Sequence, residues 1–273
     1  MVLKTRGKFL LALFCAFSAI AIAQPPAPES GIIGIAHIAF RVSDIDKELA
    51  FLGKLGYEES FALNNGKSIG EVFVKVNDRQ FIELYPRTDP SQPLGWMHVC
   101  YEVGDVNVLY NFYKSMGLKM EAVQKASAGN LITGVDDPDG RITEFTQYSP
   151  DSKHMLDKGQ HLGANRISTQ LMGFDLPVRD GAVEKEFYTD LGFEPQDSGN
   201  SVRLIAPGAP DMHISLRPAQ PGAPPEFLFP VPDARKAADQ MKSAGISVTR
   251  NDKLVFLHDP DGNMFIFLEV GKG

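Results

Sequence analysis

The sequence predicts an α+β fold built from four βαβββ modules, paired two by two into similar domains. The first observation is internal repetition: Asp-Pro-Asp-Gly at 137–140 recurs at 259–262, and Leu-Gly-Tyr-Glu at 55–58 recurs as Leu-Gly-Phe-Glu at 191–194. The second is that apolar residues follow strand or helix spacing in the same order within each module. The third is a glycine at the end of every predicted helix, where the left-handed conformation is tolerated.

The four modules contain matching elements. In the first, the predicted elements are a strand at 35–42, a helix at 44–55 and strands at 57–63, 69–77 and 79–86. In the second, they are a strand at 96–103, a helix with Leu109, Phe112, Tyr113 and Met116 on one face, and strands at 119–126, 131–135 and 141–148. The third module runs from 171 to 218 and the fourth from 226 to 270. The predicted helices end at Gly56, Gly117, Gly192 and Gly245, and the Asp-Pro-Asp-Gly segments are typical of hairpin turns.

Composition bounds the class of protein. The 273 residues are 43% hydrophobic and 22% charged, which predicts one or two globular domains. The formal net charge of -7 argues against nucleic acid and anionic membrane surfaces as partners.

The N-terminal residues resemble a secretory signal peptide. Lys4, Arg6 and Lys8 precede an apolar run at 9–23 that ends in Ala-Ile-Ala. The run is shorter than the ~20 residues of a membrane-spanning helix, so we expect cleavage after residue 23 rather than an uncleaved anchor. The mature protein is then exported, periplasmic or extracellular, and free of the membrane. We expect one domain at 31–150, a polar linker at 151–166 and a second domain at 167–273.

Four polar residues occupy matching places on the predicted strands of the first domain. Strand alternation puts His37 on the face opposite the helix-packed residues, and His98 occupies the same place in the second module. Glu83 and Glu144 lie on that face of the last strand of each module. One His and one Glu from each module can therefore converge on one point.

At these residues the sequence resembles the vicinal oxygen chelate superfamily, also called the glyoxalase/bleomycin-resistance/dioxygenase superfamily. The resemblance rests on His37 followed by Arg41 and Val42, on His98 within Met-His-Val-Cys-Tyr-Glu-Val, and on Asp-Pro-Asp-Gly-Arg-Ile-Thr-Glu at 137–144. It covers 31–150 well and 167–270 in outline. It implies two glyoxalase-like domains, each made of paired modules whose sheet curves around a cavity. It leaves open whether modules pair within one chain or exchange between two chains as a homodimer.

The resemblance implies that His37, Glu83, His98 and Glu144 bind one divalent metal, in an order like that of bacterial-type glyoxalase I. Two imidazoles and two carboxylates suit Ni²⁺, Co²⁺, Zn²⁺, Mn²⁺ or Fe²⁺. The implied activity is that of a metal-dependent lyase or isomerase on a small oxygen-chelating substrate, with Glu144 or Glu83 moving the proton.

Two other functions stay open. An extradiol-type dioxygenase would use two His and one Glu of this set, and a non-catalytic protein would only sequester a small molecule. Export argues against literal glyoxalase I, because its thiol cosubstrate belongs to the cytosol. The intact set of four ligand-type residues argues against the non-catalytic alternative.

The remaining predictions concern the pocket and the second domain. Arg41 is expected either to bind a substrate carboxylate or to pair with Glu83 or Glu102. The residues expected to line the pocket are Phe81, Tyr85, Trp96 and Ile142. The residues aligned with the four ligands in the second domain are Gly173, Ser215, Glu226 and Ile266. We therefore expect a second domain without metal, serving as support, lid or oligomer surface.

Overall fold

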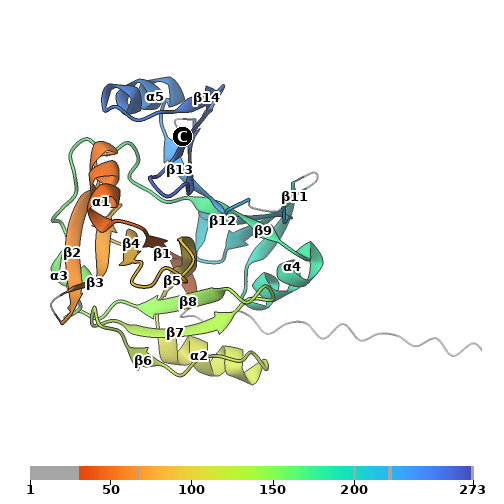
Figure 1. The fold of residues 1–273 in the computed structure, drawn as a ribbon. Helices are drawn as coiled ribbons and strands as arrows, with labels where there is room; N and C mark the ends of the chain where they lie inside the picture. The colour runs from red at the N-terminus through yellow and green to blue at the C-terminus, as the bar shows by residue number, and fades with distance from the viewer. Residues whose placement is uncertain (1–30, 67, 199–200, 221–222, 272–273) are drawn as a thin grey trace, which may run out of the picture.

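A computed structural model describes residues 31–66, 68–198, 201–220 and 223–271 (Figure 1). The predicted signal peptide at 1–23 lies outside the described residues. The chain forms two eight-stranded mixed sheets with matching strand order, one from each half. None of the helices in the described ranges has the length and apolar character needed to cross a membrane.

The first sheet joins the first two modules within one chain. Its order is β2-β3-β4-β1-β5-β8-β7-β6. The bounds are β1 Ile32–Val42, β2 Glu58–Asn65, β3 Ser68–Lys75, β4 Phe81–Pro86, β5 Gly95–Val103, β6 Gln124–Lys125, β7 Leu131–Asp136 and β8 Ile142–Gln147. In Figure 1, β2 and β3 stand at the left and β7 and β8 run across the bottom, so the sheet is strongly curved. The central pair β1 and β5 is antiparallel, while β1 pairs with β4 and β5 with β8 in parallel.

The second sheet repeats this topology in the order β10-β11-β12-β9-β13-β16-β15-β14. The bounds are β9 Gly173–Val178, β10 Glu194–Ser198, β11 Ser201–Ala206, β12 Ala209–Pro218, β13 Glu226–Val231, β14 Thr249–Asn251, β15 Leu254–His258 and β16 Met264–Glu269. The predicted α+β fold of four βαβββ modules is therefore confirmed.

One long helix follows the first strand of each module, and the four helices begin and end alike. They are α1 Ile45–Lys54, α2 Val106–Ser115, α4 Gly181–Asp190 and α5 Ala234–Ser243. Each begins after an aspartate whose carboxylate accepts hydrogen bonds from backbone N–H groups of the first turn, namely Asp44, Asp105, Asp180 and Asp233. Each ends before a glycine of positive φ, between 77° and 93°, at Gly56, Gly117, Gly192 and Gly245. The predicted helix ends are confirmed.

Two segments differ from the expectation. The strand predicted at 119–126 shrinks to the two residues of β6. The segment predicted as a linker contains a short helix, α3 (Lys153–Leu156), which the first half holds in place. The buried ammonium of Lys75 donates to Asp157 O at 2.5 Å, to Asp157 Oδ2 at 2.9 Å and to Gln160 O at 2.8 Å. This segment therefore folds back onto the first sheet.

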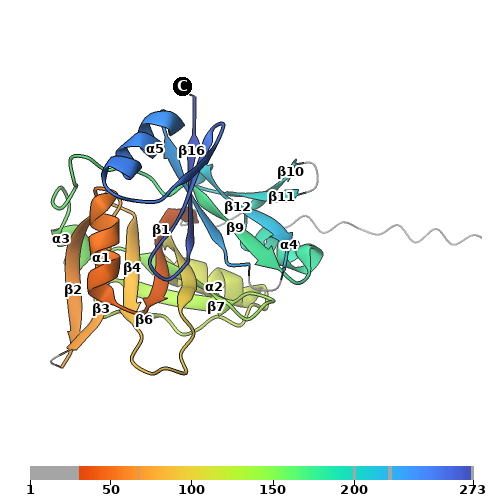
Figure 2. The same cartoon turned by 45° about the horizontal axis from the view of Figure 1, so that its top comes forward.

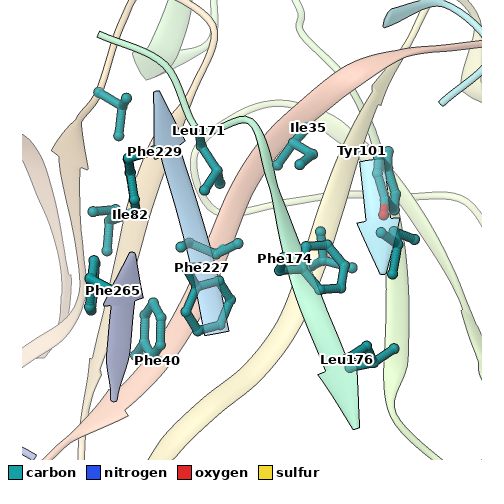
Figure 3. Close-up of a cluster of buried hydrophobic side chains, with 14 of the residues drawn as sticks. Ile35, Phe40, Ile82, Tyr101, Leu171, Phe174, Leu176, Phe227, Phe229 and Phe265 are labelled. Atoms are coloured by element: carbon teal, nitrogen blue, oxygen red, sulfur yellow. The ribbon is translucent and has the colours of Figure 1, made fainter. Parts of the chain in front are cut away.

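An aromatic core joins the two halves. Phe227 of β13 lies with its ring centroid 4.9 Å from that of Phe40 and 6.3 Å from that of Phe174 (Figure 3). Phe265 of β16 stacks on Phe40 at 6.0 Å. In Figure 2, β16 of the second half lies near β1 of the first half, in line with this ring contact. The second half therefore packs against the face of the first sheet opposite the predicted metal ligands.

The Asp-Pro-Asp-Gly turns also join the halves, each turn docking at the start of a helix in the other half. Asp261 accepts from the backbone N–H and the hydroxyl of Ser43, both at 2.6 Å. In the matching contact Arg179 Nε donates to Asp139 Oδ1 at 2.7 Å. Both glycines of these turns have positive φ, as expected of hairpin turns.

Candidate metal centre

Four side chains from the four central strands of the first sheet converge on one point. His37 lies on β1, Glu83 on β4, His98 on β5 and Glu144 on β8. The Nε2 atom of His37 lies 3.2 Å from Glu83 Oε2 and 3.5 Å from Glu144 Oε2. The Nε2 atom of His98 lies 3.5 Å and 3.8 Å from the same two oxygens. The two imidazole nitrogens are 3.2 Å apart.

Strand register explains the convergence. His98 pairs with Ala39, two residues beyond His37, so both imidazoles lie on one face of the β1–β5 pair. Glu83 also pairs with Ala39, across the parallel β1–β4 contact. Glu144 pairs with Cys100, two residues beyond His98. A strict alternation along four adjacent strands is therefore enough to bring the four side chains together.

The separations fit a shared metal ion. With metal–ligand distances of about 2.0–2.2 Å, neighbouring ligand atoms lie about 3.0 Å apart in an octahedral site and about 3.4 Å apart in a tetrahedral one. The separations that involve the two imidazole nitrogens run from 3.2 to 3.8 Å, so a small inward movement of the side chains would complete such a site. Two imidazoles and two carboxylates could hold a divalent transition metal and leave positions for a substrate.

The Glu83 carboxylate is oriented by Tyr85. Its Oε2 faces the two imidazoles, and its Oε1 lies 2.8 Å from the Tyr85 hydroxyl. The same hydroxyl lies 3.0 Å from Glu71 Oε2. Because the hydroxyl has one proton, it can donate to only one of the two carboxyl groups. Burial, together with the neighbouring Glu83, raises the pKa of Glu71 to about 8, so Glu71 holds a proton at neutral pH and Tyr85 donates to Glu83.

Charge within the site favours ionised Glu83. Burial alone would raise the pKa of Glu83, but the adjacent His37 and His98 hold it well below its usual value. Burial alone would lower the pKa of His37, but its acidic neighbours, including the ionised Glu83, raise it well above its usual value. The Glu83 carboxylate is therefore in the form that binds a cation.

Cys100 is a further donor at the site. Ligand atoms of Cys100, His37 and Glu144 lie within 4.8 Å of one another, as do those of His37, Glu83 and His98. Burial raises the pKa of the Cys100 thiol to about 12, so the sulfur is protonated at neutral pH. The thiolate is the form that binds metals, so the carboxylate set is the better ligand set.

A cavity of about 260 Å³ opens beside these residues. Its walls are formed by strands β1, β3, β4, β7 and β8, by the loop around β6 and by α3. The polar side chains that line it include His37, Glu71, Glu83, Tyr85, Asn130, Glu144 and His154. The volume lies below the roughly 300–1,000 Å³ of pockets for drug-sized ligands, so this cavity suits a small molecule.

Three of the residues expected to line the pocket lie elsewhere. Trp96 packs against Phe174 and Phe227 of the second half, with centroid distances of 6.1 and 6.4 Å. A register shift on β5 causes this, because Ala39 pairs with His98 whereas Phe40 pairs with Trp96. The extra residue between them turns the Trp96 side chain to the opposite face.

Phe81 and Ile142 are the other two. Phe81 is fully buried with its ring edge-on to His154 at 4.7 Å, so it supports the cavity wall from behind. Ile142 is 40% exposed and does not line the cavity. Tyr85 does line it.

Arg41 also lies outside this cavity. Its Nη1 donates to Pro93 O at 3.3 Å, and it lines a neighbouring hollow that shares Tyr85 with the cavity. Among the described residues it makes no ion pair with Glu83 or Glu102, and Glu102 pairs with Arg79 instead.

Sequence reasoning missed Glu71, Cys100, Asn130 and His154. Alternation placed Cys100 on the ligand face, two residues after His98, and Glu71 stands two residues before Phe73 on β3. These two were detectable from strand patterns. His154 and Asn130 come from a segment and a strand end without periodicity, so no sequence signal pointed to them.

The second half lacks this donor set. The pairings of Asp175 with Ser215 and with Glu226 repeat those of Ala39 with Glu83 and with His98. Glu226 is occupied by Arg217 at 3.2 Å. A Cβ atom at Gly173 would lie 2.0 Å from His213 O, so no other residue fits there without a backbone shift. Within the described ranges, both groups of residues that could hold a metal lie in the first half.

Comparisons with known proteins agree with this architecture. The family model of the Glyoxalase/Bleomycin resistance protein/Dioxygenase superfamily matches residues 15–145 and 159–267. Among curated proteins, none matches the sequence.

Three solved structures illustrate the fold. The Mn(II)-bound glyoxalase from Novosphingobium aromaticivorans is 17% identical with a TM-score of 0.66, and the match covers 88% of this chain and 83% of the glyoxalase chain. The 2,3-dioxygenase LapB from Pseudomonas sp. KL28 is 17% identical with a TM-score of 0.66, and the match covers 89% of this chain and 94% of the LapB chain. Homoprotocatechuate 2,3-dioxygenase from Arthrobacter globiformis is 18% identical with a TM-score of 0.67, and the match covers 90% of this chain and 82% of the dioxygenase chain. From the family match over both halves, this chain belongs to the Glyoxalase/Bleomycin resistance protein/Dioxygenase superfamily.

Proposed function

We propose that the chain binds one divalent metal through His37, Glu83, His98 and Glu144 and acts as a glyoxalase-type lyase or isomerase on a small oxygen-chelating substrate. The observation that carries the proposal is the convergence beside a cavity of two imidazole nitrogens that lie 3.2 Å apart, each of them 3.2–3.8 Å from an oxygen of both carboxylates. A bound divalent metal would polarise the oxygens of such a substrate.

The two carboxylates have different surroundings, which assigns them different roles. Glu83 is held from both sides, with one oxygen facing the imidazoles and the other accepting from Tyr85. The Glu144 side chain is 20% exposed, against 4% for Glu83, and faces the cavity. Glu144 is therefore the carboxylate with freedom to take a proton from the substrate, and Glu83 stays as the fixed ligand.

The test combines metal analysis with a proton-transfer assay. The mature protein is reconstituted separately with nickel, cobalt, manganese, zinc and ferrous iron, and the bound metal is measured by elemental analysis. Hydroxyacetone in deuterated water then reports proton removal next to the carbonyl by NMR. We expect about one metal per chain and metal-dependent exchange that Glu144→Gln abolishes. A wild type that binds none of the five metals contradicts the proposal.

An extradiol-type dioxygenase is the second candidate. Two imidazoles with one of the two carboxylates form the facial set that suits ferrous iron in oxygenases, and two of the solved structures above are dioxygenases. The iron-loaded protein is therefore also tested for oxygen uptake with catechol. Oxygen uptake without hydroxyacetone exchange would favour the dioxygenase. Ligand binding without either reaction would indicate a non-catalytic binding protein.

We also propose that the protein is exported, with the mature chain beginning at Gln24. The support is the basic and apolar N-terminal pattern that ends in Ala-Ile-Ala at 21–23. N-terminal sequencing of protein recovered outside the cytoplasm tests this. An intact Met1 terminus in the cytosolic fraction would contradict it.

A further inference from the structure

A pair of buried polar groups lies in the same cavity as the candidate metal ligands. His154 on α3 and Asn130 before β7 are 2% and 3% exposed, and both line the cavity. Asn130 Nδ2 donates to His154 Nδ1 at 2.9 Å. Within the described part of the chain, His154 Nε2 and Asn130 Oδ1 have no hydrogen-bond partner.

Leaving such groups unpaired is costly. A buried donor or acceptor without a partner has lost the hydrogen bonds that it would make to water, so two of them side by side indicate that something else in the cavity pairs with them. Burial and the nearby His37 lower the pKa of His154 to about 3, so the ring is neutral. With Nδ1 accepting from Asn130, the ring carries its proton on Nε2. The pair then offers one free donor and one free acceptor, and turning the amide over exchanges these roles without removing either.

The histidine ring is rigidly placed. The rings of Phe61, Phe73 and Phe81 surround it edge-on with centroid distances of 4.9, 4.7 and 4.7 Å. The segment that carries it is fixed by the buried ammonium of Lys75 through Asp157. A hydrogen-bonding group held this firmly is suited to recognising a ligand rather than to shuttling protons.

We propose that Asn130 and His154 form a second recognition point that binds a hydroxyl group of the substrate, beyond the two oxygens that face the metal ligands. A hydroxyl both donates and accepts, so it satisfies the free donor and the free acceptor together. The substrate class is a compact molecule with a chelating pair of oxygens and a third hydroxyl. This inference rests on the proposed function, because the chelating oxygens need a bound metal.

The test compares two probes on the cobalt-loaded full chain without oxygen. Catechol has only the chelating pair, and 3,4-dihydroxybenzyl alcohol adds a third hydroxyl. Their dissociation constants are measured from changes in the visible cobalt spectrum. We expect the wild type to bind the triol about tenfold more tightly than catechol.

The variants locate the source of that preference. His154→Phe keeps an aromatic ring and removes the nitrogens, and Asn130→Ala removes the amide if the first variant folds poorly. Each should bring the ratio of the two constants to about one, with cobalt stoichiometry and catechol affinity unchanged. His258→Phe, at an exposed site in the second half, should keep the tenfold preference.

The failures are distinguishable. Variants that bind cobalt and still prefer the triol overturn the role of Asn130 and His154, as does a wild type that binds both probes equally. In those cases the proposed function stands. A wild type that takes up no cobalt, or whose cobalt spectrum does not change when catechol is added, overturns both the proposed function and this inference.

Discussion

At the scale of single residues, the candidate metal centre should depend on the first half alone. His98→Ala and Glu144→Gln each remove one donor from a set of four, so we expect metal content to fall several-fold from about one per chain. Glu226→Gln, at the place in the second half that corresponds to His98, should leave metal content unchanged because Glu226 pairs with Arg217. Elemental analysis of the three variants and the wild type decides this, and two metals per wild-type chain would contradict it.

The two halves also differ at one buried glutamate, and the difference predicts a pH effect. Glu48 on α1 is 2% exposed, and burial followed by Asp259 and Asp261 raises its pKa to about 9. This folded-state pKa lies above the unfolded value of about 4.3. The folded state therefore holds the proton more tightly, and this contribution to stability is complete below pH 4 and is lost as the pH rises toward 9.

Glu48→Gln should remove this loss. We expect the free energy of unfolding of the variant to exceed that of the wild type by about 1–3 kcal/mol at pH 8, and to equal it near pH 4. The matched control is Glu184 on α4, which accepts from Arg141 Nη2 at 2.9 Å. Glu184→Gln removes the negative charge that pairs with Arg141 and should destabilise at pH 8 by about 1–3 kcal/mol. Urea unfolding of the wild type and both variants at the two pH values gives the four differences in free energy; equal effects of the two substitutions would refute the assignment.

At the scale of elements, the segment with α3 is a wall of the cavity because Lys75 holds it. Lys75 is fully buried and its ammonium contacts Asp157 and Asp78 at 2.9 Å. Lys75→Met leaves the Asp157 carboxylate without its main cation, so we expect a loss of about 3 kcal/mol in stability. Amide hydrogen exchange should rise first across 153–160. Lys158→Met, at an exposed position nearby, should change neither quantity; protection of 153–160 in Lys75→Met equal to the wild type would disprove the anchoring.

At the scale of the whole molecule, the aromatic core should make both halves unfold together. Phe227 is fully buried between Phe40, Phe174 and Phe265. Phe227→Ala should therefore cost about 3–5 kcal/mol. Trp96 is the single tryptophan of the sequence and packs against Phe227, so its fluorescence reports this contact. We expect fluorescence and far-ultraviolet circular dichroism to give one coincident urea transition; two separated transitions would mean that the halves fold independently.

The sequence by itself determined the modular fold and brought the four candidate ligands to one face. Both results depend on local rules that hold along one strand or one helix. Alternation fixes the face of His37 and Glu83 wherever the strand is regular, and a glycine ends each helix because it tolerates positive φ. The internal repeat predicted that Gly173 corresponds to His37, and the strand register of the second sheet gives the same correspondence.

Only the tertiary structure decided what surrounds those four residues. Trp96 does not line the pocket, because the pairing of β1 with β5 contains an extra residue. Such a bulge depends on how two strands pair, so the pattern along one strand does not reveal it. His154 entered the cavity because Lys75, far away in the sequence, holds a segment without periodicity against the first sheet. Contacts between distant segments leave no repeating pattern in the sequence, so the second recognition point became visible only when the chain was folded.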